Sequence, residues 1–369
     1  ARMINSSGIG TYIKNIIPSL SNEYDLILIG NSNEIKNVFQ KSLIDNIQII
    51  NCTAPIYSIT EQIQLPKLIP SCDIFWTPHI NIPLFPIKAK KRIVTIMDMF
   101  HYAHLKELSI AKRIYTKVIL NRAVTKSSLI FTISEYSKKE IVKYTRVDEK
   151  KVHTIKLGID LNYFRRNDDL KKNDTVRKRY RLPQNYILFV GNVKPHKNLK
   201  NLLIALSIMK ENKSNHKLVI VGKKDGFITG DSGLEEVIKA YNLAEDVIFT
   251  GFADKEDLPI IYSAASIFCF PSLYEGFGFP PLEAMACGVP TAVSNSTSIP
   301  EVCGEASVYF DPTEPEDIAR RLLNTLTDVS LKNQLILKGY KKVLEYTWLN
   351  CINSHLEKIH ALLGFGMRV

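Results

Sequence analysis

Residues 269–290 read Cys269-Phe-Pro-Ser-Leu-Tyr-Glu275-Gly-Phe-Gly-Phe-Pro-Pro-Leu-Glu283-Ala-Met-Ala-Cys-Gly-Val-Pro290, and the architecture of the chain follows from this stretch. The apolar run Ala264–Phe270 predicts a buried strand, which a proline and a serine end. Pro280 and Pro281 fit the first turn of a helix, where a missing N–H costs nothing. Gly288 ends that helix. The stretch therefore predicts a strand, a glycine loop and a short helix in succession.

Two carboxylates flank the glycine loop: Glu275 lies within it, and Glu283 lies one turn inside the helix. The free N–H groups of a helix start and of glycine-rich backbone bind phosphate, and a carboxylate beside them can accept hydrogen bonds from hydroxyl groups. Solvated surface positions would also explain two glutamates at this spacing. However, a continuous helix cannot run through Gly-Phe-Gly-Phe-Pro-Pro, so a turn must bring the pair together. We expect both carboxylates to face one cleft.

The segment from Glu275 to Glu283 resembles the paired-glutamate signature of the retaining, nucleotide-sugar-dependent glycosyltransferases of family four, which have the GT-B fold. Residues 271–290 match that signature nearly residue for residue, and Ser298-Ile-Pro-Glu-Val-Cys-Gly-Glu-Ala matches it downstream. This form of the signature is similar to that of many bacterial mannosyltransferases that build surface polysaccharide. Weaker similarity covers most of the chain.

The resemblance implies an α/β protein of GT-B architecture, in which two Rossmann-like, doubly wound domains face a central cleft and a C-terminal helix crosses back to the first domain. Residues 1–165 would form the N-terminal, acceptor-binding domain, residues 166–345 the nucleotide-sugar-binding domain, and residues 346–369 the returning helix. The charged segment 162–183 marks the boundary. In the family an apolar strand precedes the first glycine loop, and residues 1–7 do not predict one. Either residues that lie upstream are missing, or the first domain starts in an unusual way.

The alternation of apolar runs with helical stretches predicts parallel, doubly wound sheets from the residues alone. The strands are predicted at 24–30, 46–50, 72–77, 92–97, 129–134, 152–160, 186–190, 217–222, 247–251, 264–270 and 290–294. Ligands on such sheets bind beyond the carboxyl ends of strands. Pro78-His79 and Asp98–His101, which follow two of the strands, are therefore places where chemistry is expected.

The composition is that of a soluble globular protein, with 369 residues of which 45% are hydrophobic and 23% charged. No run of about 18 apolar residues predicts a membrane-spanning helix, and the first residues lack the apolar core of a signal peptide. The six cysteines form no Cys-x-x-Cys pair, so neither a zinc site nor a disulfide framework is predicted. Reduced thiols in a cytoplasm are expected.

The net charge of +11 favours anionic partners. The basic residues are not interleaved with aromatics as in nucleic-acid-binding modules, so we expect no nucleic acid and prefer anionic lipid or phosphate-bearing substrates. Residues 105–126 have a helical pattern, with Ile110, Ile114, Val118 and Ile119 set against Lys106, Lys112, Arg113, Lys117, Arg122 and Lys126. This face either rests on an anionic membrane or is simply solvated. We expect a cytoplasmic protein, peripheral on the inner face of the cytoplasmic membrane.

Two glycine turns precede predicted helices. The first contains Gly8 and Gly10 and leads into an amphipathic helix; in the resembled family such a loop lies at the mouth of the cleft. The second begins at Gly191 and has Lys197 at the helix start, where the helix dipole disfavours a cation unless an anion is bound. This second turn resembles the family's phosphate-binding loop, in which Lys197 pairs with the donor diphosphate and Asn192 stands where some members have arginine.

The strand at 92–97 often ends in His-Asp in the resembled enzymes. Here Met97 occupies the histidine position and Asp98 remains. His101, three residues further on, lies where some relatives carry a histidine. The resemblance assigns Asp98 and His101 to the acceptor and sugar side of the cleft, and a purely structural role for His101 is the alternative.

The resemblance implies hexose transfer with retention of configuration, in which the acceptor attacks on the leaving-group face and its proton passes to the departing phosphate. No Asp-x-Asp metal motif occurs, so we expect no metal and no cofactor. Lys197, the glycine loop and the helix start would neutralise the diphosphate. The catalytic candidates are Glu275, His101, Asp98 and Lys197, and the donor-binding candidates are Gly8, Gly10, Gly191, Asn192, Lys197, Gly276, Phe277, Gly278, Leu282 and Glu283.

The signature favours GDP-mannose as the donor, although users of UDP- and dTDP-sugars share it, and an oligosaccharide or lipid-linked acceptor is expected. A nicotinamide-dependent dehydrogenase would need Gly-x-Gly-x-x-Gly after a strand, with an acidic residue about 20 positions further on, and the sequence has none. A non-catalytic glycan-binding protein could keep the same fold. It would not need Lys197, Glu275 and Glu283 together, and all three are present.

Overall fold

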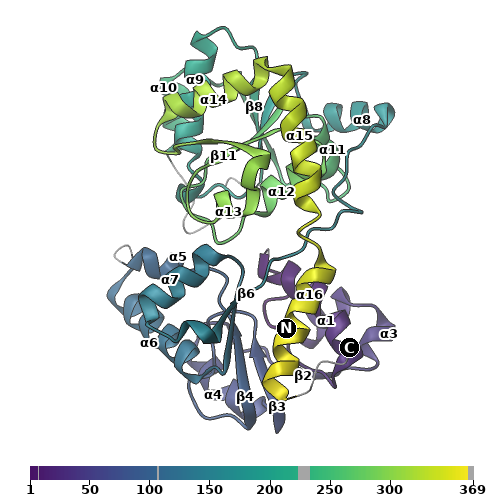
Figure 1. Ribbon diagram of the computed structural model, residues 1–369, viewed down its shortest axis with the longest axis vertical. Helices are drawn as coiled ribbons and strands as arrows, with labels where there is room; N and C mark the ends of the chain where they lie inside the picture. Colours follow the sequence, from purple (N-terminus) through teal and green to yellow (C-terminus); the bar gives the residue numbers. More distant parts are fainter. Residues whose placement is uncertain (7, 106–107, 223–232, 365–369) are drawn as a thin grey trace. The chain divides into compact units, whose positions relative to one another are not determined.

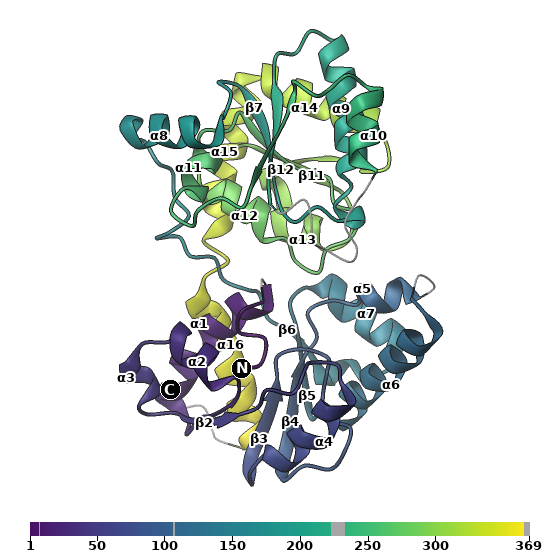
Figure 2. The same cartoon turned by 180° about the vertical axis from the view of Figure 1, so that it is seen from behind.

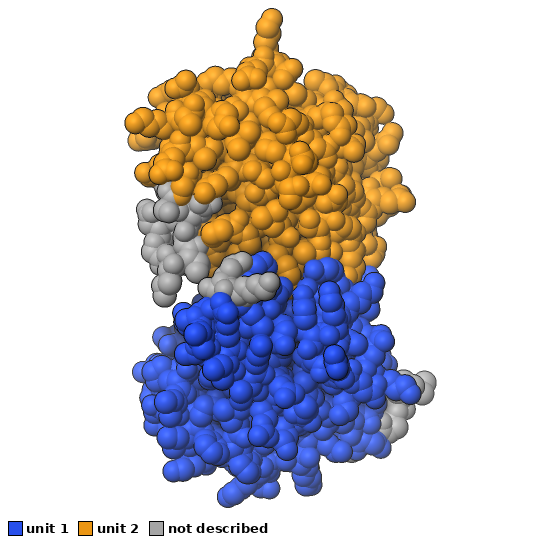
Figure 3. Space-filling model, turned by 90° about the vertical axis from the view of Figure 1, so that its left-hand side faces the viewer, with its two compact units in different colours: residues 1–158, 348–369 blue, residues 159–347 orange. Residues whose placement is uncertain are grey.

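The computed structural model describes residues 1–6, 8–105, 108–222 and 233–364, and the chain divides into two compact units. Unit 1 comprises Ala1–Gly158 and Trp348–Val369, and unit 2 comprises Ile159–Thr347. Figure 3 shows the two units in different colours. Each unit is an α/β structure in which helices cover parallel strands (Figure 1).

The strands of unit 1 form two parallel sheets within the described residues, a pair β1-β2 and a four-stranded sheet of order β3-β4-β5-β6. Their bounds are β1 Ile27–Gly30, β2 Gln48–Asn51, β3 Cys72–Thr77, β4 Ala89–Thr95, β5 Leu129–Thr132 and β6 Val152–Thr154. All six strands overlap the predicted ranges, but β4 runs over 89–95 where 92–97 is predicted, and β6 ends at Thr154 where the prediction continues to residue 160. Residues 1–4, which lie beside β1, form turns in which the Ile4 N–H donates to the Ala1 carbonyl at 3.1 Å. No described strand therefore joins the pair to the larger sheet.

The helices of unit 1 are α1 Gly8–Glu23, α2 Ser32–Val38, α3 Lys41–Ile44, α4 Ile59–Leu68, α5 Phe100–Ala103, α6 Ile110–Lys126, α7 Glu135–Thr145 and α16 Trp348–Leu363. The expected helix over 105–126 begins at Ile110, and Lys106 lies outside the described residues. The inner face of α6 packs with Val94, Ile130 and Ile141 into the core of the unit.

The last helix, α16, belongs to unit 1 and packs against α1. The buried Tyr12 hydroxyl of α1 lies 2.6 Å from Nε2 of His355 on α16, and Nδ1 of His355 lies 2.7 Å from the Cys351 carbonyl. Burial lowers the pKa of His355 to about 4, so the imidazole is neutral at physiological pH. A neutral histidine can share a hydrogen bond with the tyrosine without bringing a charge into the core.

Unit 2 contains, within its described residues, one six-stranded parallel sheet of order β12-β11-β10-β7-β8-β9. The strands are β7 Tyr186–Val190, β8 Lys217–Val221, β9 Val247–Gly251, β10 Ile267–Phe270, β11 Thr291–Ser294 and β12 Ser307–Phe310. From β7 at the centre of the sheet the chain adds β8 and β9 toward one edge. It then returns to β10, beside β7, and adds β11 and β12 toward the opposite edge. This is the doubly wound, Rossmann-like topology that the sequence predicts.

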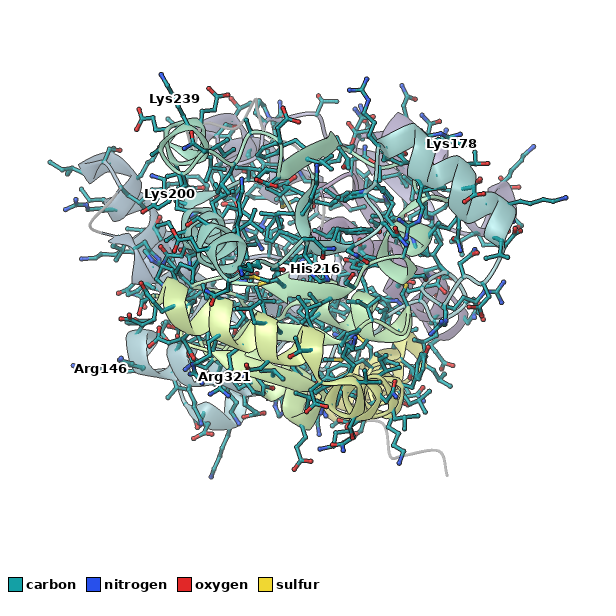
Figure 4. All side chains as sticks on the ribbon, turned by 90° about the horizontal axis from the view of Figure 1, so that it is seen from above. Arg146, Lys178, Lys200, His216, Lys239 and Arg321 are labelled. Atoms are coloured by element: carbon teal, nitrogen blue, oxygen red, sulfur yellow. The ribbon has the colours of Figure 1, made fainter. Side chains whose placement is uncertain are left out.

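Helices cover both faces of this sheet (Figure 2). They are α8 Leu170–Tyr180, α9 Leu199–Glu211, α10 Leu234–Ala240, α11 Leu258–Ser263, α12 Phe279–Ala286, α13 Ile299–Cys303, α14 Pro315–Thr327 and α15 Val329–Val343. Helix α9 packs with α10 and α14, whereas α12 packs with α11 and α15. Seen from above, Lys200 marks α9 and Lys178 marks α8, and the Lys178 residue is exposed (Figure 4).

The chain passes from unit 1 to unit 2 after Gly158 and returns before Trp348, whereas the sequence places these boundaries after residues 165 and 345. The earlier boundary has a packing cause, because the Phe164 ring lies edge-on to Tyr262 of α11 with 6.1 Å between ring centroids. The Ile159 N–H also donates to the Tyr346 carbonyl at 2.9 Å. No helix in the described ranges has both the length and the apolar composition that a bilayer-spanning segment needs.

Candidate active site

The candidate site in unit 2 lies where the strand order reverses, between the adjacent strands β7 and β10. The Ile267–Ile187 and Phe268–Leu188 pairings place the carboxyl ends of these two strands side by side. In doubly wound sheets the loops that leave such a point diverge to opposite faces and leave room for a ligand. The segments 191–198 and 271–278 are these two loops.

Lys197 and Glu275 meet at this point. After β7 the chain makes a tight helical turn, Pro195–Lys197, and the Asn198 backbone takes the left-handed conformation at a φ of 59°. Lys197 Nζ donates to Glu275 Oε1 at 2.5 Å, and the two side chains are 16% and 14% exposed. The ammonium also lies 5.2 Å from the centroid of the Phe270 ring. The pair is thus a partly buried ion pair whose ammonium group packs against an aromatic ring.

Asn198 ties the two loops together. Its Nδ2 donates to the Pro271 carbonyl at 3.1 Å and to the Pro312 carbonyl at 2.6 Å. The Leu273 N–H donates to the His196 carbonyl at 2.8 Å. Because Asn198 is buried, these bonds fix the loop after β7 against the loop after β10.

The loop after β11 holds the backbone of Glu275. The Glu275 N–H donates to Thr297 Oγ1 at 3.1 Å, and the Ser298 hydroxyl is within hydrogen-bond distance of the carbonyls of Glu275, at 2.8 Å, and Phe277, at 3.1 Å. The Phe277 ring is buried against Phe279 and Tyr346. Phe277 therefore anchors the loop from the inside, and only its backbone is available to a ligand.

The glycine loop leads into α12 with free donors. Gly278 precedes the first helical residue at a φ of 115°, which a residue with a Cβ rarely adopts. Among the described residues, no acceptor takes the N–H groups of Gly276, Phe277 and Gly278. Leu282, one turn into the helix, is fully buried in the core. The loop thus presents consecutive backbone donors beside Lys197, an arrangement suited to phosphate.

Glu283 has a separate partner. The Tyr262 hydroxyl of α11 donates to Glu283 Oε2 at 2.7 Å. Burial raises the pKa of Glu283 to about 7, although the hydrogen bond from Tyr262 partly offsets this rise. The hydrogen bonds within the described residues thus join Glu275 to Lys197 and Glu283 to Tyr262, and none joins the two glutamates to each other.

Glycines bring the loops after β7 and β8 into close contact. The Gly191 N–H donates to the Val221 carbonyl at 2.9 Å, and a Cβ at Gly222 would lie 2.1 Å from the Gly191 carbonyl oxygen. Gly222 is therefore required for this approach. Asn192 follows Gly191 and is half-buried at the same edge of the sheet.

The candidates in unit 1 lie at a different sheet edge. Asp98 Oδ1 accepts the Phe100 N–H at 2.9 Å, and Asp98 and His101 line a small cavity of about 20 Å³, room for about one water molecule. The His101 side chain is exposed on α5. Gly8 is the first residue of α1, and Gly10 packs where a Cβ would lie 2.5 Å from the Ile4 carbonyl oxygen. Close packing explains Gly10 without a ligand.

Residues 172–342 match the family model described as Glycosyl transferases group 1. The matched span contains all six strands of the sheet in unit 2 that the described residues form, together with Lys197, Glu275 and Glu283. Residues 172–342 are a group 1 glycosyltransferase domain.

Relatives of the chain that carries this group 1 domain include mannosyltransferases. The chain is 32% identical over 239 residues to O-antigen chain mannosyltransferase B of Escherichia coli. The aligned residues cover 64% of this chain and 61% of that protein. It is 31% identical over 307 residues to the serotype-specific mannosyltransferase WbdA of Escherichia coli, covering 82% of this chain and 35% of that protein. The chain thus spans less than two thirds of the length of these relatives.

Solved structures similar to the chain extend beyond the group 1 domain. Sucrose-phosphate synthase from Thermosynechococcus elongatus aligns with a TM-score of 0.78 at 18% identity, over 98% of this chain and 94% of that one. Anabaena Alr3699/HepE in complex with UDP-glucose aligns with a TM-score of 0.76 at 14% identity, over 96% of both chains. These likenesses confirm the GT-B fold that the sequence predicts.

The residues that support the site in the group 1 domain were not predicted from the sequence. Asn198, Thr297, Ser298 and Tyr262 position the loops and carboxylates, and each does so through a contact far away in the sequence. The sequence pointed to one of these residues indirectly, because Ser298 begins the segment that resembles the family downstream of the paired glutamates.

Proposed function

We propose that the protein is a retaining hexosyltransferase that moves a sugar from a nucleoside-diphosphate sugar to a glycan or lipid-linked acceptor in the synthesis of a surface polysaccharide. The observation that carries this proposal is the Lys197–Glu275 pair at the switch point between β7 and β10, beside the free amides of Gly276–Gly278. A cation and converging amides suit a diphosphate, and an adjacent carboxylate suits a sugar that gains positive charge.

Charge on the leaving group is the main problem in such a transfer. The Lys197 ammonium and the amides of Gly276–Gly278 would neutralise the diphosphate as the bond between the sugar and the phosphate oxygen breaks. The start of α12 adds its dipole in the same sense. We propose a metal-independent reaction with no cofactor, because Lys197 and these amides can supply the positive charge that a divalent cation would otherwise provide.

Retention requires attack on the face that the leaving group occupies. The acceptor oxygen forms a bond to the anomeric carbon while the bond from that carbon to the phosphate oxygen breaks, and the acceptor proton passes to the departing phosphate. Glu275 would hold the sugar and stabilise the positive charge that builds on the ring. Its ion pair with Lys197 holds the carboxylate in place for this role. Glu283 would bind the ribose hydroxyls, and Asp98 and His101 of unit 1 would serve the acceptor.

The names of the relatives support mannose as the transferred sugar, since several are mannosyltransferases. We propose GDP-mannose as the donor and keep UDP- and dTDP-sugars as the alternative within the same enzyme class. A non-catalytic glycan-binding protein on the same fold is the alternative in another class. It would bind glycans but turn over no donor.

Donor binding without added metal tests this proposal. GDP-mannose, UDP-glucose, UDP-N-acetylglucosamine and dTDP-rhamnose would be titrated calorimetrically in the presence of EDTA, with Lys197→Ala and Glu283→Ala alongside. We expect one donor to bind, and both variants to weaken it at least tenfold. Lys178→Ala on the exposed surface of α8 is the matched control and should bind normally. Failure of every donor to bind the intact protein would overturn the proposal.

A membrane surface is proposed as a further partner on the basis of α6. Its outward face carries Ile110, Ile114 and Val118, one turn apart and 75%, 59% and 45% exposed. The helix contains five basic residues and no acidic one, namely Lys112, Arg113, Lys117, Arg122 and Lys126. Exposed isoleucines flanked by cations suit the headgroup region of an anionic bilayer. We propose that unit 1 rests on the inner face of the cytoplasmic membrane through α6.

A further inference from the structure

Unit 1 contains a buried hydrogen-bonded network that the proposed reaction does not use. Its centre is Asn81, which is 1% exposed and follows β3. Asn81 Nδ2 donates to Glu61 Oε2 at 2.7 Å, and Oδ1 accepts from the Tyr115 hydroxyl of α6 at 2.8 Å. Its backbone N–H donates to His79 Nδ1 at 3.1 Å. One buried amide thus fixes an acid, a tyrosine and a histidine from three segments.

The network also holds a strained residue. Tyr57, in the loop between β2 and α4, has a φ of 65°, although it is not a glycine. Its N–H donates to Glu61 Oε2 at 2.6 Å, and Glu61 is buried and ion-paired with Arg2. A left-handed conformation is unfavourable for a residue with a Cβ, and such strain is often stored at binding sites. The Tyr57 residue is 52% exposed.

His79 offers an unused donor beside that ring. The residue is 7% exposed, and burial lowers its pKa to about 3, so the imidazole is neutral. Because Nδ1 accepts the Asn81 N–H, the proton must sit on Nε2. No acceptor in the described part of the chain takes this Nε2 proton.

The three rings form one aromatic cluster. The Tyr57 ring lies edge-on to His79, with 6.3 Å between centroids, and edge-on to Tyr115, with 6.4 Å between centroids. Tyr57 and His79 follow β2 and β3, at the carboxyl ends of parallel strands where ligands bind on such folds. Asp98, which follows β4, lies near enough that its charge, after burial and Glu61, helps raise the pKa of Tyr57.

We propose that Tyr57 and His79 form a subsite for a neutral sugar ring, which is the terminal residue of the acceptor glycan. The exposed tyrosine face would pack against the apolar C–H face of the pyranose, and His79 Nε2–H would donate to a hydroxyl oxygen. Because His79 is uncharged, its N–H can bind a neutral hydroxyl without attracting the anionic nucleoside-diphosphate sugar. That the bound sugar is part of the acceptor rests on the proposed function. The existence of a sugar subsite does not rest on it.

The chain offers variants that separate binding from stability. Tyr57→Gly removes the ring and relieves the left-handed strain, so it should keep or raise the thermal unfolding temperature while it weakens sugar binding. His79→Asn keeps an acceptor at the Nδ1 position for the Asn81 N–H and removes the distal donor. Tyr241→Gly, at an exposed tyrosine of unit 2, is the matched control.

The experiment is saturation-transfer NMR on the full chain with methyl α-mannoside, methyl α-glucoside and mannobiose at millimolar concentration. We expect at least one probe to bind, with its Kd raised tenfold or more in Tyr57→Gly and His79→Asn and unchanged in Tyr241→Gly. Absence of binding to the intact protein, or unchanged binding in folded Tyr57→Gly, would overturn the subsite. Nucleotide-sugar titration in the same samples separates the two proposals: sugar binding without donor binding keeps the subsite and rejects the transferase, and the reverse keeps the transferase and rejects the subsite.

Discussion

The Tyr262 hydroxyl donates to Glu283 Oε2 at 2.7 Å. Burial raises the pKa of this Glu283 carboxyl group to about 7. The folded protein therefore binds this proton more tightly than the unfolded chain does, for which 4.5 is the ordinary value. Stability from this group is fully present below about pH 4.5 and is lost as the pH rises through about 7. Glu283 is thus held ready for a hydroxyl ligand at a cost to stability.

Glu283→Gln tests that cost. The amide oxygen can still accept from Tyr262, but the side chain no longer titrates. Relative to the unsubstituted protein, we expect the variant to gain stability between pH 5 and pH 8, by at most about 3 kcal/mol for a shift of this size. Urea unfolding at the two pH values measures the gain. Parallel pH profiles for the two proteins would show that Glu283 is already ionised when folded.

Lys197→Met should weaken nucleoside-diphosphate binding at least tenfold whatever the base, because the lysine would contact the diphosphate. It should also lower the free energy of unfolding by about 1–3 kcal/mol, since Glu275 is left partly buried without its partner. Adding Glu275→Gln should recover part of that loss, and a double-mutant cycle measures the coupling. Additive losses from the two substitutions would mean that the ion pair contributes no coupling energy.

Ser298→Ala removes the hydroxyl that lies within bonding distance of the Glu275 and Phe277 carbonyls. We expect a loss of about 1 kcal/mol in unfolding free energy and a fall in kcat of about tenfold, with a smaller change in the donor KM, because a looser loop misplaces Glu275. Ser296→Ala in the same loop is the control, since its hydroxyl has no hydrogen-bond partner among the described residues. Equal effects of the two substitutions would remove Ser298 from the positioning of Glu275.

Gly222→Ala should be strongly destabilising. The added Cβ would lie 2.1 Å from the Gly191 carbonyl oxygen, so the loops after β7 and β8 would have to separate. Gly251 also has a positive φ, 71° against 148° at Gly222, but no atom lies within 4 Å of the added Cβ in Gly251→Ala. We expect Gly251→Ala to cost about 1 kcal/mol and Gly222→Ala to lower the unfolding temperature several times as far. Thermal unfolding of the two variants measures the difference.

The α6 surface is tested with vesicles. Ile110→Ser combined with Ile114→Ser should reduce co-sedimentation with vesicles of anionic phosphatidylglycerol at least fivefold, and neutral phosphatidylcholine vesicles should bind neither protein. Leu337→Ser, at an exposed leucine of α15, is the control for a general loss of apolar surface. If the intact protein failed to bind anionic vesicles at low salt, the membrane part of the proposal would be wrong.

Local sequence patterns accounted for most elements of the fold. Apolar runs bounded by glycine and proline located β1 to β11, whereas β12 at Ser307–Phe310 was not predicted. The glycine loop and paired prolines located the start of α12 at Phe279. These features are readable because strand period, helix capping and proline chemistry act over a few residues. The same locality explains why the ends of elements and units shifted: α6 begins at Ile110 and unit 2 at Ile159, where packing against other elements decides.

Tertiary structure alone decided which side chains meet. Lys197 and Glu275 are 78 positions apart and become partners because β7 and β10 are neighbours in the sheet. Asn198, 114 positions from Pro312, locks the loops around them. In unit 1, Tyr57 and His79 converge only because Glu61 and Asn81 are buried together. Strand order and burial set these contacts, and both depend on how the whole chain packs, which no local pattern in one sequence records.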